Sequence, residues 1–344
     1  MPITIRDIAK KLNLSIAAVS RALDGYDDIS EETRLRVVQT AQKMGYVPNR
    51  AARQLRRQKA DAIGYVLPSP TPRFADPFFT EFLAGLGDEM ARHPFDLIIS
   101  IAPPGKEAEK RIYQNWVQGR KVDGFILTHL RMQDWRMEYL SRQRVPFSAL
   151  ESLPDKQPFR RVNVDRQAGM VELVVHLHQL GFRRIGYIGG PDELQIQASQ
   201  FAGYRQGLEK TGQLFFADLV ITGDLTSSSG YLAARQLLSL PAPPDAMVCI
   251  NDETAFGVMH ALREENIQIG VDVAVTGFDG VAASAYSDPP LTTLDIPVYD
   301  IAVQLVSLLS DELEQKGRGD RQVVITPRLL KRNSTSGVQV MTIA

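Results

Sequence analysis

Residues 15–25, SIAAVSRALDG, place a single arginine among small side chains in a stretch with the signals of a short helix. Ser15 is a typical capping residue at a helix N-terminus, and Gly25 is typical just beyond a helix end. Helical periodicity puts Val19 and Leu23 on one face, which we expect to be buried. The opposite face then carries Ile16, Ala17, Ser20 and Arg21.

This second face has the side chains that contact with DNA requires. Small side chains let a helix approach base edges and thymine methyl groups in a major groove. The guanidinium of Arg21 can donate to guanine or to phosphate. The alternative is an ordinary helical domain in which Arg21 is solvated, since short matches of this kind also occur by chance.

A basic segment, PNRAARQLRRQKA at 48–60, follows and holds five positive charges within residues 50–59. A short helix there has almost nothing to fold against and should be disordered alone. Beside DNA its arginines can meet phosphates, and Leu55 can wedge between base pairs in the minor groove. A solvated charged linker is the alternative, which explains the arginines but not Leu55.

The elements that must position these residues are three short helical patterns: 5–12, the helix after Ser15, and a third from Ser30 to Gly45. Two helices joined by a three-residue turn make a helix-turn-helix. Residues 1–59 carry a net charge of +6, and the remaining 285 residues carry −7. A basic head on an acidic body suggests that the head meets a polyanion.

From Asp61 onward the sequence contains strand patterns as well as helical patterns. Short β-rich runs at 62–67, 96–100, 124–128, 184–190, 247–252 and 273–279 alternate with longer helical patterns such as 79–92, 167–180 and 254–265. This alternation predicts βαβ units and parallel sheets, and its length favours two α/β subdomains. Such sheets bind ligands at the carboxyl ends of their strands.

Composition sets further bounds on the class of protein. The chain has 344 residues, 44% hydrophobic content and one cysteine, Cys249, which excludes an internal disulfide and fits a reducing compartment. Its first residues, MPITIRDIAKK, are charged where a signal peptide needs an apolar core. We therefore expect a cytoplasmic protein.

Enzymatic motifs are not found in the sequence. His176 and His178 diverge on a helix and cannot chelate one metal ion. GYIGG at 186–190 lacks the spacing of a dinucleotide loop, and the serines at 227–229 are typical of a helix start. We expect no catalytic residue, no metal and no cofactor.

Several stretches closely resemble the lactose-repressor/galactose-repressor (LacI/GalR) family. In the head these are TIRDIAKKLNLS, AVSRALDG, ISEETRLRVVQTAQKMGYVPN and ARQLRRQ; in the core they are YIGGP, CINDETAFGVMHAL, VAVTGFD and PPLTTLD. The resemblance implies a recognition helix after Ser15, with specificity positions at Ile16 and Ala17, and a palindromic operator opened by Leu55 at a central CG step. Ala18 departs from the threonine of most members. The DNA-contacting residues that the resemblance implies are Thr4, Ser15, Ile16, Ala17, Ser20, Arg21, Asn49, Ala52, Arg53, Leu55 and Arg56.

The resemblance also implies the domain organisation. It predicts a helix-turn-helix domain at 1–48, a hinge helix at 49–60 and a periplasmic-binding-protein-like core at 61–344. The core would consist of two Rossmann-like subdomains with three crossings, near 161, 290 and 323. The first subdomain would comprise about 61–161 and 291–322, and the second about 162–290 and 323–340.

The resemblance also implies which residues contact the effector, from their positions in the family's motifs, and it places them in the cleft between the subdomains. They are Phe74, Phe78, Thr128, Glu151, Gln200, Leu225, Asn251 and Asp279. Carboxylates and amides suit a ligand rich in hydroxyl groups. Local alternatives are that Asp279 and Asp252 cap the next helix and that Phe79 faces the core. Gln200 replaces an arginine found in many members, which argues against an anionic effector.

The sequence therefore predicts a homodimeric, allosteric transcriptional repressor that a neutral sugar releases from its operator. A purine- or nucleoside-responsive corepressed regulator is the alternative within the family. A solute-binding protein is disfavoured by the basic head.

Overall fold

The computed structural model describes residues 3–46, 59–68, 77–102, 105–153, 159–314 and 321–336. The chain forms two compact units, residues 1–60 and 61–344. We call them the head and the core and describe each by itself.

The head consists of three helices, α1 (Ile5–Leu12), α2 (Ile16–Leu23) and α3 (Glu31–Met44). The Ser15 hydroxyl caps α2 by accepting a hydrogen bond from the amide of Ala18 at 3.0 Å. Ile8, Val19 and Val37, one from each helix, are fully buried and meet in a small apolar core. The predicted helix-turn-helix is confirmed, as is the burial of Val19.

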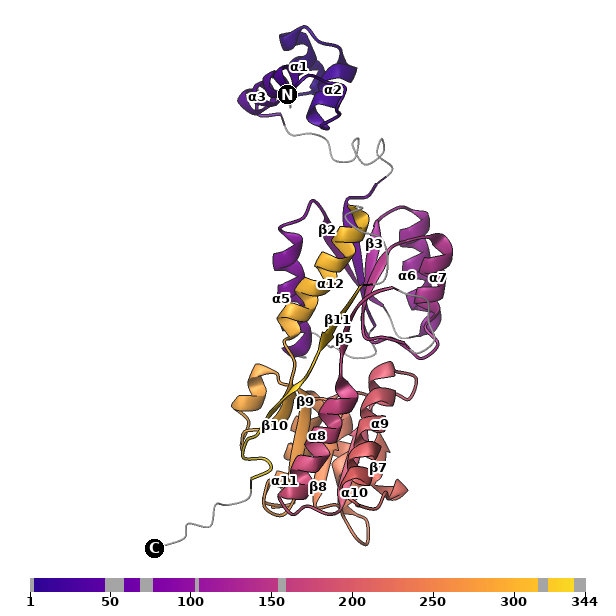
Figure 1. The fold of residues 1–344 in the computed structure, drawn as a ribbon, viewed down its shortest axis with the longest axis vertical. Helices are drawn as coiled ribbons and strands as arrows, with labels where there is room; N and C mark the ends of the chain where they lie inside the picture. The colour runs from indigo at the N-terminus through magenta and orange to yellow at the C-terminus, as the bar shows by residue number, and fades with distance from the viewer. Residues whose placement is uncertain are drawn as a thin grey trace, which may run out of the picture. The chain divides into compact units, whose positions relative to one another are not determined.

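The first subdomain of the core contains a six-stranded parallel sheet in the order β11-β5-β4-β3-β1-β2. Helices α5 and α12 lie side by side on one face (Figure 1), and α6 covers the other face, where Tyr113 stacks on Phe125 of β3. The elements are β1 (Ala62–Pro68), α5 (Pro77–Met90), β2 (Asp96–Ala102), α6 (Lys106–Gln118), β3 (Gly124–Leu127), α7 (Trp135–Gln143), β4 (Phe147–Leu150), β5 (Arg160–Val164), α12 (Val298–Leu313) and β11 (Gln322–Ile325).

The second subdomain repeats this architecture with the strand order β12-β10-β9-β8-β6-β7, in which β12 alone is antiparallel. Tyr187 and Val248 pack under α8 and α9, while Ile188 and Met247 face α10 and α11. The elements are α8 (Arg166–Gln179), β6 (Ile185–Gly189), α9 (Gln195–Lys210), η2 (Ala217–Leu219), β7 (Val220–Thr222), α10 (Ser227–Leu238), β8 (Ala246–Cys249), α11 (Asp252–Glu264), β9 (Ala274–Asp279), η3 (Ala282–Ala285), β10 (Thr292–Asp295) and β12 (Arg328–Leu330).

The chain crosses between the subdomains three times, a few residues later than the sequence predicted. The strand β5 stays in the first sheet to Val164, β10 stays in the second sheet to Asp295, and β11 stays in the first sheet to Ile325. The predicted boundary at 290 wrongly assigned β10 to the first subdomain. The two prolines before β10 end a loop of the second subdomain, and the strand after them still pairs with β9.

Both sheets have the doubly wound strand order, which reverses between β1 and β3 and again between β6 and β8. In such sheets the loops at these reversals separate and leave a crevice at the carboxyl ends of the strands. No helix among the residues that the structure describes has the length and apolar character needed to cross a membrane.

Candidate DNA-binding face and effector pocket

The exposed face of α2 carries three of the side chains expected to meet DNA. Ile16 is 46% exposed, Ala17 is exposed, and the Arg21 side chain is 50% exposed. Arg21 forms an ion pair of 2.5 Å with Asp28 and lies 5.3 Å from the centroid of the Tyr26 ring. The guanidinium is thus held at the surface of the head by residues beyond the end of the helix.

Ser20 does not lie on the exposed face of α2. It is only 5% exposed, and its hydroxyl donates to Asp24 at 3.4 Å. The expectation that it lies on the free face is wrong. Thr4 is exposed at the start of α1, and its hydroxyl donates to Asp7 at 2.7 Å. Hydrogen bonds from Thr4 hold the pKa of Asp7 below its ordinary value. Five expected DNA contacts lie outside the described residues: Asn49, Ala52, Arg53, Leu55 and Arg56.

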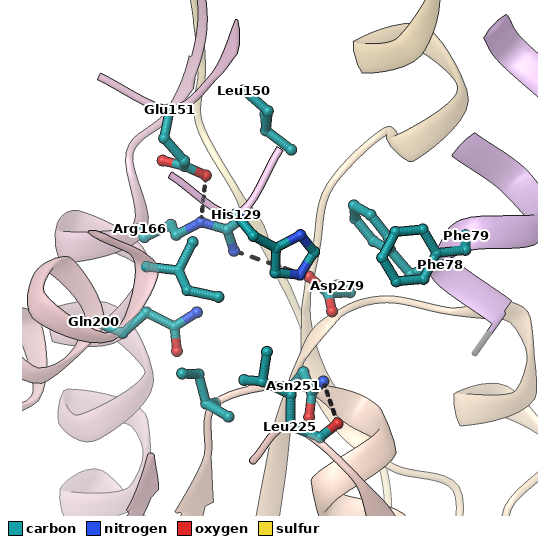
Figure 2. Close-up of a pocket in the computed structure, with 12 residues that line it drawn as sticks. Phe78, Phe79, His129, Leu150, Glu151, Arg166, Gln200, Leu225, Asn251 and Asp279 are labelled. Atoms are coloured by element: carbon teal, nitrogen blue, oxygen red, sulfur yellow. Dashed lines mark hydrogen bonds and ion pairs between the residues drawn. The ribbon is translucent and has the colours of Figure 1, made fainter. Parts of the chain in front are cut away.

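A pocket lies in the core where strand ends of the two subdomains face each other (Figure 2). His129 follows β3, Glu151 follows β4, and Phe78 and Phe79 lie at the start of α5. The second subdomain contributes side chains from α8, α9 and the ends of β8 and β9. The complete lining is Phe78, Phe79, His129, Leu150, Glu151, Arg166, Ile196, Gln200, Leu225, Ile250, Asn251 and Asp279.

Aromatic rings form one wall of the pocket. Phe79 and His129 are stacked, with centroids 5.6 Å apart and planes 17° apart. Phe78 meets Phe79 edge-on, with centroids 5.5 Å apart. A flat apolar wall of this kind can pack against a sugar face or a planar base.

Charged groups form another part of the lining. The Nε atom of Arg166 donates to Oε1 of Glu151 at 2.7 Å, and Nη1 lies 3.8 Å from Oδ1 of Asp279. The guanidinium also lies 4.7 Å from the centroid of the Phe278 ring. Burial raises the pKa of Glu151, and the charge of Arg166 opposes that shift. Arg166 thus already has two carboxylate neighbours without a ligand.

Gln200 is the most unusual residue of the pocket. It is fully buried, and neither its amide oxygen nor its amide nitrogen has a hydrogen-bond partner. Figure 2 shows the amide facing into the pocket from α9. A buried amide without partners costs about 1–3 kcal/mol. The group is therefore suited to a ligand that offers both a donor and an acceptor.

Other predicted residues have supporting contacts. Asn251 caps α11 by accepting from the amide of Thr254 at 2.9 Å, and it donates to the carbonyl of Leu225 at 3.1 Å. Thr128 does not line the pocket: it is 1% exposed, and its hydroxyl contacts the Tyr65 hydroxyl at 3.1 Å and His129 Nδ1 at 3.2 Å. Phe74 lies outside the described residues.

Four lining residues have left-handed backbone conformations. The φ angles are +50° at His129, +89° at Glu151, +72° at Leu225 and +104° at Asp279. This region is costly for side chains other than glycine, and such strain gathers at functional sites. It turns the side chains at the strand ends into the crevice.

Five residues of the lining were not predicted from the sequence: His129, Arg166, Leu150, Ile196 and Ile250. The sequence also did not decide whether Phe79 faces the pocket or the core. His129 directly follows a predicted strand, so its place at a strand end was a usable signal. Arg166 gave no such signal, because a cation at the start of a helix is usually solvated.

The residues expected to have no chemical role are structural. Cys249 is buried in β8, and burial raises the pKa of its thiol. His176 contacts the hydroxyl of Thr335 at 3.1 Å. Among the residues that the structure describes, no group of three histidine, cysteine or acidic side chains could hold a metal ion.

Comparison with known proteins decides the family. Residues 4–49 match the model described as bacterial regulatory proteins, lacI family, and residues 174–335 match the periplasmic binding protein-like domain. The HTH-type transcriptional regulator AglR of Rhizobium meliloti (strain 1021) is 30% identical over 339 residues, which cover 97% of this chain and 95% of AglR. The chain belongs to the LacI family.

Other relatives agree with this assignment. The HTH-type transcriptional repressor CytR of Escherichia coli (strain K12) is 29% identical over 332 residues, 96% of each chain. The lac repressor dimer bound to operator and the anti-inducer ONPF superimposes with a TM-score of 0.82, at 25% identity over 98% of this chain and 100% of that one. A transcriptional regulator CelR–cellobiose complex matches with a TM-score of 0.75, at 26% identity over 96% and 99%.

This LacI-family protein is a DNA-binding transcriptional repressor. Its head is the helix-turn-helix domain, and its core is the α/β ligand-binding domain of the family. The predicted family, fold class and general function are confirmed.

Proposed function

We propose that the repressor binds a neutral, hydroxyl-rich small molecule, a sugar, in the pocket of Figure 2, and that binding releases it from its operator. The observation that carries this proposal is the unpartnered, fully buried amide of Gln200. It offers one neutral acceptor and two donors, which match the hydroxyl groups of a sugar. An anionic ligand would instead need a cation with no carboxylate beside it.

The neighbouring charges support a neutral ligand. Glu151 and Asp279 both lie near Arg166, so an anion entering the pocket would meet two carboxylates. Each carboxylate oxygen can accept a hydrogen bond from a hydroxyl group. Among the similar structures, the CelR complex contains cellobiose.

We further propose that the protein acts as a homodimer whose two heads read the halves of a palindromic operator. A two-fold dimer matches the symmetry of two half-sites. The lac repressor structure that superimposes on this chain is a dimer on its operator. The proposed base contacts come from Ile16, Ala17 and Arg21.

A nucleoside effector is the second candidate. The stacked pair Phe79 and His129 offers a flat wall on which a base could lie, and the Gln200 amide could pair with the base edge. In that case the effector could strengthen operator binding and act as a corepressor.

The test is operator binding, measured by fluorescence anisotropy on a palindrome selected by the protein from random DNA. The panel is neutral mono- and disaccharides, sugar phosphates, purines and nucleosides. Release by a neutral sugar alone would support the first proposal, and tighter binding with a purine or nucleoside would replace it with the second. Asp279→Asn should lose the response and keep operator binding, whereas Asp300→Asn, at an exposed residue of α12, should keep both.

A further inference from the structure

The ion pair of Arg166 and Glu151 joins the two subdomains of the core. Glu151 follows β4 of the first subdomain, and Arg166 is the first residue of α8 in the second. The two side chains are 5% and 3% exposed, and the Nε–Oε1 distance is 2.7 Å. A charge-assisted hydrogen bond shielded from water in this way is among the stronger polar contacts in a protein.

The position of Arg166 is unfavourable for α8 itself. A helix N-terminus carries a partial positive charge, so a cation in the first turn is destabilising. Asp165 already caps the helix by accepting from the amide of Ala168 at 3.1 Å. Arg166 therefore contributes nothing to starting the helix, and its two carboxylate neighbours account for its place.

Backbone hydrogen bonds also cross between the subdomains beside the pocket. The amide of Gln195 donates to the carbonyl of Leu130 at 2.8 Å, and the amide of Met132 donates to the carbonyl of Glu193 at 2.9 Å. Residue 195 starts α9, the helix that carries Gln200 into the pocket. These two amides consequently report whether the subdomains are in contact at this place.

The deepest residues of the pocket are shielded from solvent in this closed arrangement. Gln200 is fully buried, Glu151 is 2% exposed and Ile250 is 1% exposed, so a ligand cannot reach them from solvent while the subdomains stay closed. Among the described residues, neither Nη atom of Arg166 donates a hydrogen bond, and Nη1 lies 3.8 Å from Asp279. The N–H groups of both Nη atoms can therefore donate hydrogen bonds to an oxygen atom of a ligand.

We infer that Arg166 is a positioning residue that couples effector occupancy to the separation of the subdomains. Its Nε atom donates to Glu151 of the first subdomain, and its Nη atoms bind the effector together with Asp279. A ligand that fills the pocket strengthens the closed state through the same guanidinium that bridges the subdomains. The second half of this inference rests on the proposed function, while the bridging role does not.

The bridging role is tested without any ligand, by hydrogen exchange on the full-length protein. Glu151→Gln and Arg166→Met should speed exchange at the amides of Gln195 and Met132 at least about tenfold, while amides inside the two sheets stay unchanged. Glu312→Gln is the control, because it removes the 3.0 Å ion pair with Arg160, which lies within the first subdomain. Unchanged exchange at both amides, or a uniform increase throughout the core, would overturn the inference.

A single variant can leave a buried charge unpaired and unfold the core. The double variant Glu151→Met with Arg166→Met removes both charges and avoids that cost, and the same exchange pattern is expected of it. The coupling is then tested with cellobiose and D-glucose, by calorimetry and operator anisotropy on each variant. Arg166→Met should bind a sugar that acts on the wild type more weakly, because the Nη donors are lost. At a sugar concentration that saturates the variant, it should release operator less than a third as much as the wild type does.

Release equal to the wild type would overturn the coupling. If neither these sugars nor the wider panel acts on the wild type, the proposed sugar function fails, while the exchange result still decides the bridging role.

Discussion

Arg21 and Asp28 form an ion pair of 2.5 Å on the surface of the head, and both side chains are about half exposed. An exposed pair of this kind contributes at most about 1 kcal/mol to stability. The pair therefore costs little to open when DNA approaches. Until then it holds the guanidinium beside Ile16 and Ala17, on the face that we expect to enter the major groove.

Arg21→Ala should weaken operator binding by about 10- to 100-fold, which is the effect of one good contact to a base. It should change the free energy of unfolding by less than about 1 kcal/mol, because the ion pair is exposed. Anisotropy titrations at several salt concentrations distinguish a base contact, which is lost on the operator only, from a phosphate contact, which is lost on all DNA.

Asp28→Asn is the matched control for this prediction. It releases Arg21 and removes a negative charge near the DNA, so the operator affinity should stay equal or rise. Weaker binding by this variant, or wild-type binding by Arg21→Ala, would contradict the assigned role.

The helices of the head could be predicted closely because their ends carry local signals. Ser15 and Ser30 accept hydrogen bonds from the first turns of α2 and α3, and Gly45 ends α3 with a φ angle of +68°. Ser20 could not be placed in this way. Periodicity gives the direction of a side chain, but its burial depends on the contact with Asp24, which follows the helix.

Gln200→Leu should make the core more stable and its effector binding weaker. The leucine removes two buried polar atoms that have no partner, so the free energy of unfolding should rise by about 1 kcal/mol or more. The same change removes the donors and the acceptor offered to the ligand. Urea denaturation and calorimetry with the releasing sugar measure the two effects.

Gln197→Leu is the control from the same helix. Gln197 is also buried, but its Oε1 accepts hydrogen bonds from the Tyr187 hydroxyl and the amide of Gly190, each at 3.0 Å. Its loss should destabilise the core by about 1–3 kcal/mol, because two buried donors lose their acceptor. Similar destabilisation by both variants would show that Gln200 is part of the packing and not of a binding site.

His129→Ala should weaken effector binding about two- to tenfold, since stacked rings contribute about 0.5–1.5 kcal/mol beyond buried area. His129→Phe keeps a flat ring against Phe79 and should retain most of the affinity. Calorimetry with the same sugar compares the two variants. Equal losses in both would assign the effect to the imidazole nitrogens and not to the aromatic wall.

Residues of the pocket could be predicted only where their position at the end of a predicted strand indicates that they lie there. Asn251 and Asp279 lie at the ends of parallel strands, and those ends gather at one edge of a sheet. The partnership of Arg166 with Glu151 joins residues on either side of a subdomain crossing. No local pattern contains that contact, and the crossing itself was predicted about three residues too early.

Asp252 makes one contribution to the pH dependence of the core's stability. It is 1% exposed at the start of α11, and burial raises the pKa of its carboxyl to about 7, although the Thr293 hydroxyl, the amide of Val281 and the charge of Arg332 oppose the shift. The folded protein keeps a proton there that the unfolded chain loses near its ordinary value of 3.8. Stability from this group is therefore complete below about pH 4 and is lost as the pH rises to about 7.

Asp252→Asn should remove this pH-dependent contribution to the free energy of unfolding. The asparagine oxygen can accept from the amide of Val281, and its amino group can donate to the hydroxyl oxygen of Thr293. Urea denaturation of both proteins between pH 4 and pH 8 isolates the group, because all other titrations are shared. The difference between the two curves should change by up to about 1.4 kcal/mol per pH unit within this window. Parallel curves would mean that Asp252 is ionised in the folded core throughout, held by the Thr293 hydroxyl, the amide of Val281 and the charge of Arg332.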